Sequence, residues 1–320
     1  MTLYEGCLIK LRGREEIFYI KGLVEESGRY IALPRYVPSE RGDRIDLRGR
    51  RYVVLKTFDE QIEYLKRKAP ELFRLSKIFG TYLPLISEED IDEAYHPDTK
   101  LRDILRRPIY EIDETISKLV KELTREIPIN LIGVTGSRLV DLTGPGQDID
   151  LLILDYRYVR NVIRILSKIR EDREDIITKF VEYHRKNLRF PKHVLKRILE
   201  RRVLENVFRG YPYFVRILLM RNYEKCIIYR RVRSISRVVT YGKIIESNDL
   251  SYTTPCIHKV RTSINVNYLI SDKGVFTDTL VICDAFRILG RLEVGELYVQ
   301  DVGIIRRWIY LDSSSVISLP

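Results

Sequence analysis

Two short apolar runs near the middle of the chain are bordered by small and acidic residues. The first run, 129–134, ends just before Gly136 and Ser137, and the second begins around the pair Asp148 and Asp150. Residues i and i+2 of a strand point to the same face, so the two aspartates would share one face. The unbroken apolar residues after them suit a strand that is buried in a sheet. We therefore expect a mixed α and β core here, with two carboxylates at the start of a buried strand.

The residue types around this strand suit a metal-bound triphosphate. Two neighbouring carboxylates repel each other unless a cation lies between them, and Mg²⁺ is a hard cation that proteins hold with one or two carboxylates. Gly136 would let a phosphate approach the backbone, and Ser137 adds a hydroxyl beside the first amides of a helical turn. Two metal ions about 3.5–4 Å apart could activate an acceptor hydroxyl and stabilise a leaving pyrophosphate. A lone Asp-x-Asp is more often a pair of turn acids, but the added Gly-Ser favours a site for Mg²⁺ or Mn²⁺ with an NTP as substrate.

A resemblance to a known family rests on the same residues. Gly136, Ser137 and Arg138, followed by Asp148 and Asp150, resemble the signature of the DNA polymerase β-type nucleotidyltransferase superfamily. The resemblance implies catalytic metal ligation by the two aspartates and nucleotide contact by the three residues of the turn. It also implies a reaction, in which a nucleoside monophosphate moves from an NTP to a hydroxyl acceptor and pyrophosphate is released.

The flanking sequence narrows the resemblance. The segments 33–38, 49–52 and 133–137 read Leu-Pro-Arg-Tyr-Val-Pro, Gly-Arg-Arg-Tyr and Gly-Val-Thr-Gly-Ser. Together they are similar to an archaeal group of predicted nucleotidyltransferases, over most of the chain. That group supplies a reaction type and no acceptor.

Two departures from the superfamily pattern bear on catalysis. Gln147 stands where the superfamily often has a serine before the first aspartate. The superfamily usually has a third carboxylate on a later strand, and the corresponding run, 213–220, offers Arg216 and no acid. Glu224 and Asp155 are poor substitutes by position. A protein that kept the fold and binds nucleotide or RNA without catalysis is therefore the alternative hypothesis.

The positive charge of the chain is concentrated in one segment. The formal net charge is +11, and residues 156–237 carry +15. Residues 1–58 carry +4, while 59–126, 127–155 and 238–320 carry −4, −3 and −1. A basic block of this kind suits a polyanion, because each neutralised phosphate releases counterions. RNA is the partner that we favour. The basic block is equally compatible with a solvated helix surface paired with acids elsewhere, as in an enzyme that modifies protein or a small molecule. The cations expected to contact RNA are Arg185, Lys186, Arg189, Lys192, Lys196 and Arg197.

Length and apolar patterning predict an α+β fold with four parts. Residues 1–58 alternate as a small β domain, and 59–126 switch to a helical connecting segment. Residues 127–237 form the nucleotidyltransferase-like α/β core. Residues 238–320 return to short strands of a β-barrel-like domain of OB-like size, and these strands include the runs 238–239, 244–245 and 280–283.

Three helices are expected in the connecting segment. One covers about 59–68, one begins at Ser87 with Asp90 in a capping-box position, and one covers about 112–126. In the basic block, residues 176–209 are predicted to form helix with a break near Pro191.

Several protein classes are excluded by pattern. No apolar run approaches the roughly 18 residues of a membrane-spanning helix, and the first residues lack the apolar core of a signal peptide. The four cysteines are scattered without metal-ligand spacing, which predicts reduced structural thiols. None of the four histidines has a convincing partner, so we expect surface or capping roles for them. These features favour a cytoplasmic protein, and the dense charge of both signs leans towards a thermophile.

Overall fold

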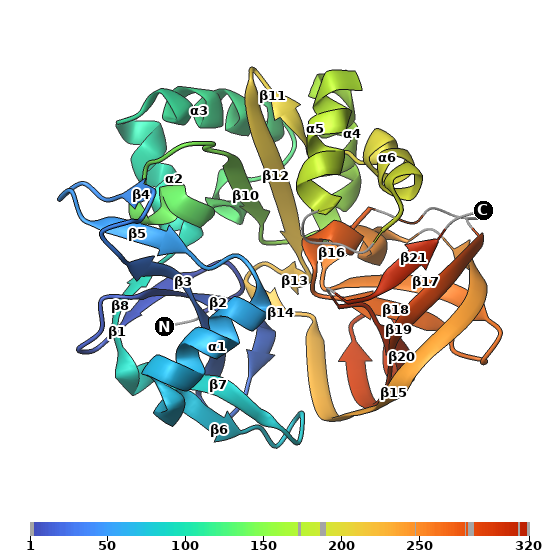
Figure 1. Cartoon of the computed structure of the whole chain (residues 1–320). Helices are drawn as coiled ribbons and strands as arrows, with labels where there is room; N and C mark the ends of the chain where they lie inside the picture. The colour runs from blue at the N-terminus through green and yellow to red at the C-terminus, as the bar shows by residue number, and fades with distance from the viewer. Residues whose placement is uncertain are drawn as a thin grey trace. The chain divides into compact units, whose positions relative to one another are not determined.

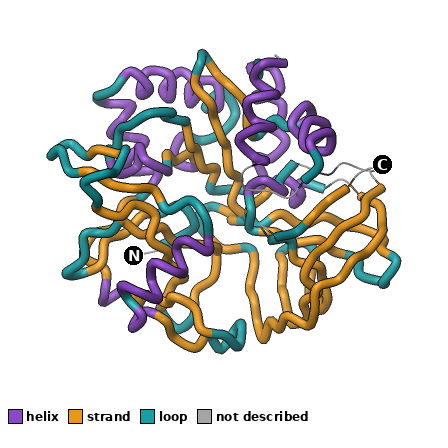
Figure 2. The backbone as a smooth tube through the Cα atoms, in the orientation of Figure 1, coloured by secondary structure: helices purple, strands orange, loops and turns teal. Residues whose placement is uncertain are grey.

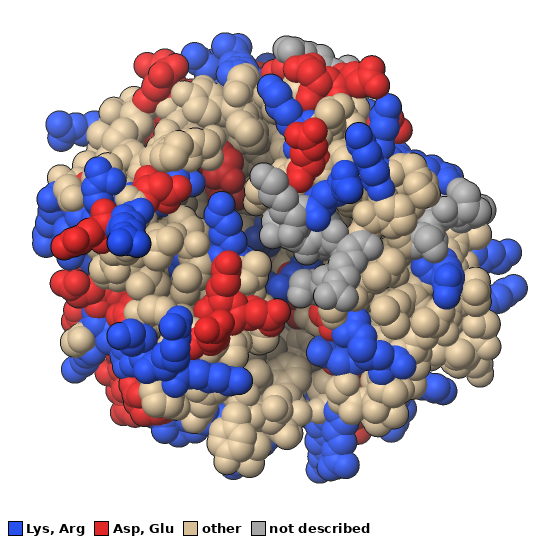
Figure 3. Space-filling model, viewed as in Figure 1, with Lys and Arg blue, Asp and Glu red and all other residues tan. Residues whose placement is uncertain are grey.

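The computed structural model describes residues 3–171, 174–185, 190–246, 248–278, 280, 285–312 and 314–318. It is a mixed α and β structure with several sheets, which confirms that part of the prediction (Figure 1). Two compact units divide the chain. Unit 1 combines Met1–Thr124 with Pro128–Leu152, and unit 2 combines Arg125–Ile127 with Ile153–Pro320. Figure 3 shows Lys and Arg side chains interspersed with Asp and Glu on the face turned to the viewer.

Unit 1 is built around an N-terminal sheet in the order β4-β5-β3-β2-β1-β8, with β7 pairing β3 and β6. Alternating burial along its strands places one row of apolar side chains on the core side. The strands are β1 (Leu8–Leu11), β2 (Ile17–Glu25), β3 (Arg29–Pro38), β4 (Arg44–Ile45), β5 (Arg51–Val54), β6 (Phe73–Leu75), β7 (Tyr82–Ser87) and β8 (Ile91–Tyr95).

Three helices follow or interrupt this sheet. Helix α1 (Phe58–Lys68) begins with a capping box between Thr57 and Glu60, as its pattern predicts. Helix α3 (Glu111–Leu123) buries one apolar stripe, close to the predicted range. Helix α2 (Pro97–Arg106) was not predicted.

The helix predicted to begin at Ser87 is wrong. Ser87 ends strand β7, where it lies opposite Arg29 of β3, and its side chain makes no capping hydrogen bond. Only the short 3₁₀ turn η2 (Glu88–Asp90) separates β7 from β8. Pairing with the sheet therefore outweighs the local capping signal, because β7 and β8 both gain backbone hydrogen bonds that a helix end would forgo.

The predicted strand at 129–134 begins later than expected. Residues Ile129–Leu131 form a 3₁₀ turn, η3, and strand β9 covers Ile132–Val134. The 3₁₀ turn η4 (Gly136–Val140) follows, and strand β10 (Ile149–Ile153) lies next to β9 in the sheet. Helix α2 packs on β9 so closely that a Cβ at Gly133 would lie 2.6 Å from Cβ of Pro97.

Unit 2 begins with helices and a short hairpin. The helical stretch 176–209 is shorter than predicted, because a strand follows its second helix. The elements are η5 (Tyr156–Tyr158), α4 (Val159–Ile169), α5 (Glu174–Arg185), α6 (Lys192–Arg201), β11 (Glu205–Phe208), β12 (Tyr211–Leu218), β13 (Met220–Arg221), β14 (Glu224–Lys225), η6 (Asp249–Tyr252) and β16 (Thr253–Thr254). Strand β12 pairs antiparallel with β11 and parallel with β16.

The rest of unit 2 is a closed barrel. Its strands follow one another in the order β15-β17-β18-β20-β19, and β19 returns to pair with β15. All pairs are antiparallel except β18 with β20, which is the strand order of a five-stranded OB-fold barrel. The strands are β15 (Ile227–Glu246), β17 (Cys256–Thr262), β18 (Tyr268–Ser271), β19 (Ala285–Val299), β20 (Gly303–Tyr310) and β21 (Val316–Ser318), which pairs β19.

The long strand β15 absorbs several runs that the sequence presents as separate strands. The runs at 238–239 and 244–245 both lie within it, and bulges between Arg230 and Arg233 and between Ser234 and Ser236 bend it around the barrel (Figure 2). A further strand predicted at 280–283 falls mostly outside the described residues.

Helices α5 and α6 are fastened to the barrel by apolar packing and by a buried ionic cluster. Val181, Val194 and Ile198 share one core with Ile288 and Ile309. No described helix is long and apolar enough to cross a membrane.

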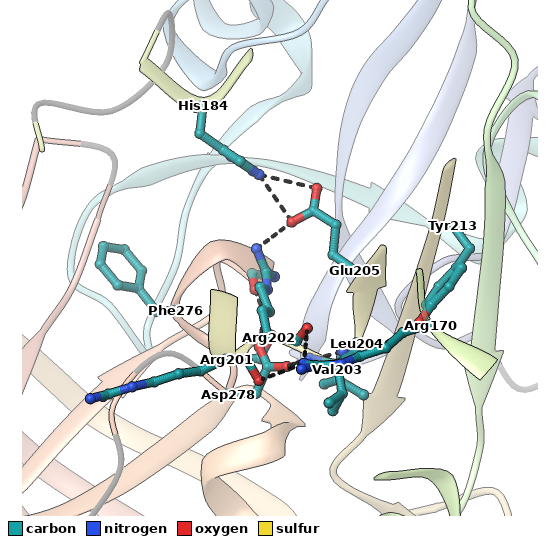
Figure 4. Close-up of polar contacts among 12 residues, drawn as sticks. Arg170, His184, Arg201, Arg202, Val203, Leu204, Glu205, Tyr213, Phe276 and Asp278 are labelled. Carbon is teal, nitrogen blue, oxygen red and sulfur yellow. Dashed lines mark hydrogen bonds and ion pairs between the residues drawn. The ribbon is translucent and has the colours of Figure 1, made fainter. Parts of the chain in front are cut away.

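The ionic cluster centres on Arg202, which is 1% exposed (Figure 4). Its Nε donates to Asp278 at 3.0 Å, one terminal nitrogen contacts Glu205, and the other donates to the carbonyl of Gly274. His184 Nε2 lies 3.0 and 3.1 Å from the two Glu205 oxygens. The expectation of a surface or capping role is therefore wrong for His184, which is buried against a carboxylate that sequence spacing does not reveal.

Candidate active site

The turn after β9 is shaped around the carboxylate of Asp150. Gly136 has a φ of +66°, and a Cβ on it would overlap Oδ2 of Asp150 and lie 3.1 Å from its Cγ. The backbone N–H of Thr135 donates to the Asp150 carbonyl at 2.9 Å, which fixes β9 and β10 in register at this point. Only glycine permits both the left-handed conformation and this close approach. Gly136 and Asp150, predicted as parts of one site, are in contact.

Asp148 lies beside Asp150 at the entrance to β10. Asp148 is exposed, Asp150 is half-buried, and Ile149 between them is fully buried, so the two carboxylates project from the same side of the strand. The charges of both aspartates affect the pKa of Tyr36 on β3. Its pKa is raised to about 12, mainly by burial, with Asp150 and Asp148 adding to the rise and Arg35 opposing it. The two negative charges therefore converge on one region of unit 1.

Ser137 lies at the start of η4, directly after Gly136. Its side chain is 9% exposed, and its carbonyl accepts a hydrogen bond from the N–H of Leu142 at 3.0 Å. Within the described ranges, no hydrogen-bond partner is seen for the Ser137 hydroxyl. The hydroxyl can therefore serve a ligand without breaking an internal bond.

Arg138 is engaged within the protein. Its side chain is 1% exposed, and its Nε and one terminal nitrogen donate to the two Asp113 oxygens at 2.9 and 3.2 Å. The other terminal nitrogen lies 3.2 Å from Asp141, and the guanidinium carbon is 4.4 Å from the centre of the Tyr110 ring. These contacts join η4 to the start of α3. They indicate a structural role, and the predicted contact between Arg138 and a nucleotide stays a prediction.

The N-terminal sheet holds the loop between the turn and the carboxylates. Leu139 and Leu142 pack in one cluster with Tyr36 of β3 and Tyr52 of β5. Further along, Thr143 and Ile45 exchange backbone hydrogen bonds of 2.9 and 2.8 Å. The loop between positions 136 and 148 is therefore held by the N-terminal sheet, which the sequence predicts as a separate domain.

The two hollows described on unit 1 lie beside this turn. One of about 270 Å³ is lined by α2 residues together with Asp113 and Arg138. The other, of about 640 Å³, is lined by the N-terminal sheet, α2 and residues 139–142. Neither is lined by Asp148 or Asp150. Of the two carboxylates, Asp148 is exposed and Asp150 is half-buried.

The donor set of the site fits a hard divalent cation. Asp148 and Asp150 supply carboxylate oxygens from one face of one strand, and Gly136 leaves room for the Asp150 carboxylate against the turn. Over the described residues, no group of three or more His, Cys, Asp or Glu side chains is arranged to hold a metal. A magnesium ion here would depend on two carboxylates plus water and substrate oxygens, which is a common arrangement for this ion.

The candidates for a third carboxylate have other tasks. Asp155 is fully buried, caps η5, and forms a two-point ion pair with Arg157 while accepting from the N–H of Asn222 at 3.1 Å. Glu224 is exposed in the short strand β14. Arg216 lies on β12 with its guanidinium 5.6 Å from the centre of the Phe214 ring. None of these contacts resembles metal ligation.

Four of the predicted RNA-contacting cations lie on two helices of unit 2. Arg185 ends α5, and Lys192, Lys196 and Arg197 are exposed on α6. Lys196 pairs with Glu174 at 3.1 Å, which reduces the charge it offers to a polyanion. Lys186 and Arg189 lie outside the described residues.

Comparison with known proteins identifies one domain. Residues 116–205 match the family model of the nucleotidyltransferase domain, and this stretch contains Gly136, Ser137, Asp148 and Asp150. A search of curated proteins and a search of solved structures each found no match. The predicted family relationship is therefore confirmed at the level of a nucleotidyltransferase domain, and the archaeal group stays a prediction.

Proposed function

We propose that this protein is a metal-dependent nucleotidyltransferase that moves a nucleoside monophosphate from an NTP to a hydroxyl acceptor, with RNA favoured as the acceptor. The observation that carries the proposal is the contact between Gly136 and the carboxylate of Asp150, with Asp148 on the same face of β10. The match of residues 116–205 to the nucleotidyltransferase domain supports the same reaction. Pyrophosphate is the second product.

Each residue of the site has a part in this mechanism. Asp148 and Asp150 would hold Mg²⁺ or Mn²⁺, which supplies positive charge to the triphosphate and lowers the pKa of an acceptor hydroxyl. Gly136 leaves room for the Asp150 carboxylate beside the turn that a phosphate would approach. The Ser137 hydroxyl donates to a phosphate oxygen and orients the triphosphate against the carboxylates. The pair Arg138 and Asp113 keeps the turn in place.

A transfer assay tests the proposal. The protein is incubated with an NTP labelled at the α-phosphate, with Mg²⁺ or Mn²⁺ and total cellular RNA, and label in the RNA is measured. Asp148→Asn and Asp150→Asn each lower transfer about 1,000-fold, because several kcal/mol of charge stabilisation are lost. Asp92→Asn is the matched control, since Asp92 is an exposed carboxylate on β8 outside the site, and it retains wild-type transfer.

A catalytically degenerate nucleotide- or RNA-binding protein is the second candidate. The observation that favours it is the lack of a three-carboxylate group among residues in the described ranges. Nucleotide binding without label transfer, unchanged in Asp148→Asn and Asp150→Asn, would establish this alternative and refute the enzyme.

A further inference from the structure

One face of the unit 2 barrel combines basic, aliphatic and aromatic side chains. Along β15, Arg237, Val239, Tyr241 and Lys243 are exposed, whereas Thr240 is buried inside the barrel. Successive side chains of a strand point to opposite sides of a sheet, so these exposed residues form one continuous row.

The neighbouring strands extend this row sideways. Arg287 of β19 lies opposite Tyr241, Arg291 of β19 lies opposite Arg237, and Arg261 of β17 lies opposite Lys243. The Arg287 guanidinium lies 5.8 Å from the centre of the Tyr241 ring, which places both side chains on the outer surface. We call the following residues the basic face of the barrel: Arg237, Val239, Tyr241, Lys243, Arg261, Arg287, Leu289 and Arg291.

The basic face has an excess of positive charge. It contains five cations and no carboxylate. At one end, Asp312 lies 3.6 Å from Arg237 and 3.8 Å from Arg291, and Arg291 also pairs with Glu293 at 2.8 Å. At the other end, Lys243 and Arg261 have no ion-pair partner in the part of the chain that the structure describes. The apolar members are also accessible, with Val239 48% and Tyr241 58% exposed.

We propose that this basic face binds single-stranded nucleic acid, which is the RNA acceptor if the proposed transferase function holds. Cations at Lys243 and Arg261 would neutralise phosphates and release counterions. Tyr241, exposed between cations, would stack on a base, as aromatic side chains do in proteins that bind single strands.

The composition of the basic face favours nucleic acid over a protein as its partner. The central part of a protein–protein interface is depleted of charged residues. On this face Val239 and Tyr241 lie between Arg237 and Lys243 along β15. Arg287 and Arg261 lie beside this row on the neighbouring strands. The strand order of the barrel points the same way by analogy, because OB-fold barrels commonly bind oligonucleotides.

Fluorescence anisotropy with the full chain tests the proposal. Labelled single-stranded RNA of about 16 nucleotides, single-stranded DNA of the same sequence and the RNA duplex are each titrated over a range of salt concentrations. Lys243→Gln with Arg261→Gln weakens single-strand binding at least tenfold and lowers the salt slope by roughly 1.4, since each lost phosphate contact removes about 0.7. Tyr241→Ala weakens binding about tenfold with little change in salt slope.

Two double variants complete the comparison. Lys118→Gln with Lys121→Gln, on α3 of unit 1, makes the same change in charge at another surface and leaves binding within about twofold. Lys192→Gln with Lys196→Gln tests whether α6, whose cations the sequence predicts to contact RNA, binds the single strand instead. All variants are compared at equal folded fraction by circular dichroism.

Wild-type affinity in Lys243→Gln with Arg261→Gln, or equal affinity for duplex and single strand, would overturn the proposal and leave the face to a protein partner. The same conclusion follows if only the α6 variant loses binding. The proposed function fails separately: Asp148→Asn without effect on nucleotide transfer would refute the transferase, whatever the barrel variants do.

Discussion

At the scale of single residues, Gly136 is the position where backbone conformation and the candidate site meet. Its φ of +66° and the Asp150 carboxylate against its Cα leave no room for a side chain. The sequence predicts a glycine that allows a phosphate to approach. It does not reveal that the same glycine also accommodates the metal-ligand candidate, because that contact depends on the register between β9 and β10.

Gly136→Ala is expected to abolish nucleotide transfer and to lower the free energy of unfolding. The added methyl displaces the Asp150 carboxylate and adds backbone strain of roughly 1–2 kcal/mol. Gly80→Ala is the matched control, because Gly80 has a φ of +61° and nothing within 4 Å of a Cβ. It bears the backbone strain alone and keeps full transfer. Denaturant unfolding and the transfer assay measure both effects, and equal transfer by the two variants would contradict the account.

Among the elements of unit 1, the turn η4 is held by an ion pair between Asp113 and Arg138, the residue that the sequence predicts to contact the nucleotide. Arg138 matched the family signature, yet its guanidinium is buried against Asp113 at the start of α3. Asp113 also accepts hydrogen bonds from the N–H groups of Ile109 and Tyr110. A position in a motif indicates that a residue is needed, but only the fold shows whether it faces the ligand or the core.

Arg138→Met should destabilise the protein by about 3–5 kcal/mol, because it leaves the Asp113 charge buried without its partner. Lys118→Ala, which breaks the exposed pair between Lys118 and Glu114 on the same helix, should cost less than about 0.5 kcal/mol. Thermal and denaturant unfolding measure both changes. A small effect of Arg138→Met, with nucleotide affinity strongly reduced, would instead assign Arg138 to the substrate.

The ionic cluster of unit 2 predicts how the stability of the fold changes at low pH. Burial raises the pKa of Glu205, but the charge of Arg202 and the contact with His184 outweigh it and lower the pKa to about 2. A carboxyl group with a lowered pKa stabilises the fold above its unfolded pKa, near 4.5, and this contribution is lost as the pH falls towards 2.

Glu205→Gln should therefore be less stable than wild type at pH 7 by a few kcal/mol, and the difference should shrink between pH 4.5 and pH 2. Denaturant unfolding at several pH values tests this. A difference that stays constant over that range would show that the charge of Glu205 makes no pH-dependent contribution.

At the scale of the whole molecule, local patterns anticipated the mixed fold and the nucleotidyltransferase domain, and long-range contacts limited the rest. The signature around Gly136 and Asp150 is local, so it could be read directly. The helix expected at Ser87 failed because pairing between β7 and β3 decides that segment. The runs near Val238 and Ile244 belong to one strand because barrel closure extends pairing along all of β15.

Formal charge is divided unequally between the two units. Unit 1, which holds the candidate site, carries a formal net charge of −2, whereas unit 2 carries +13. The chemistry and the excess of positive charge therefore lie on different units. The basic block predicted to bind a polyanion lies in unit 2, as does the basic face of the barrel, although only Arg237 of that face belongs to the block.

We propose that Asp148 and Asp150 support transfer of a nucleoside monophosphate. The decisive experiment follows an NTP labelled in parallel at the α- and γ-phosphates, with Mg²⁺ and RNA, in wild type, Asp150→Asn and Asp92→Asn. We predict that the α-label enters RNA and the γ-label is released as pyrophosphate in wild type and Asp92→Asn, and that both signals fall about 1,000-fold in Asp150→Asn. Undiminished transfer in Asp150→Asn, or γ-label released as inorganic phosphate with no α-label in any acceptor, would contradict the account.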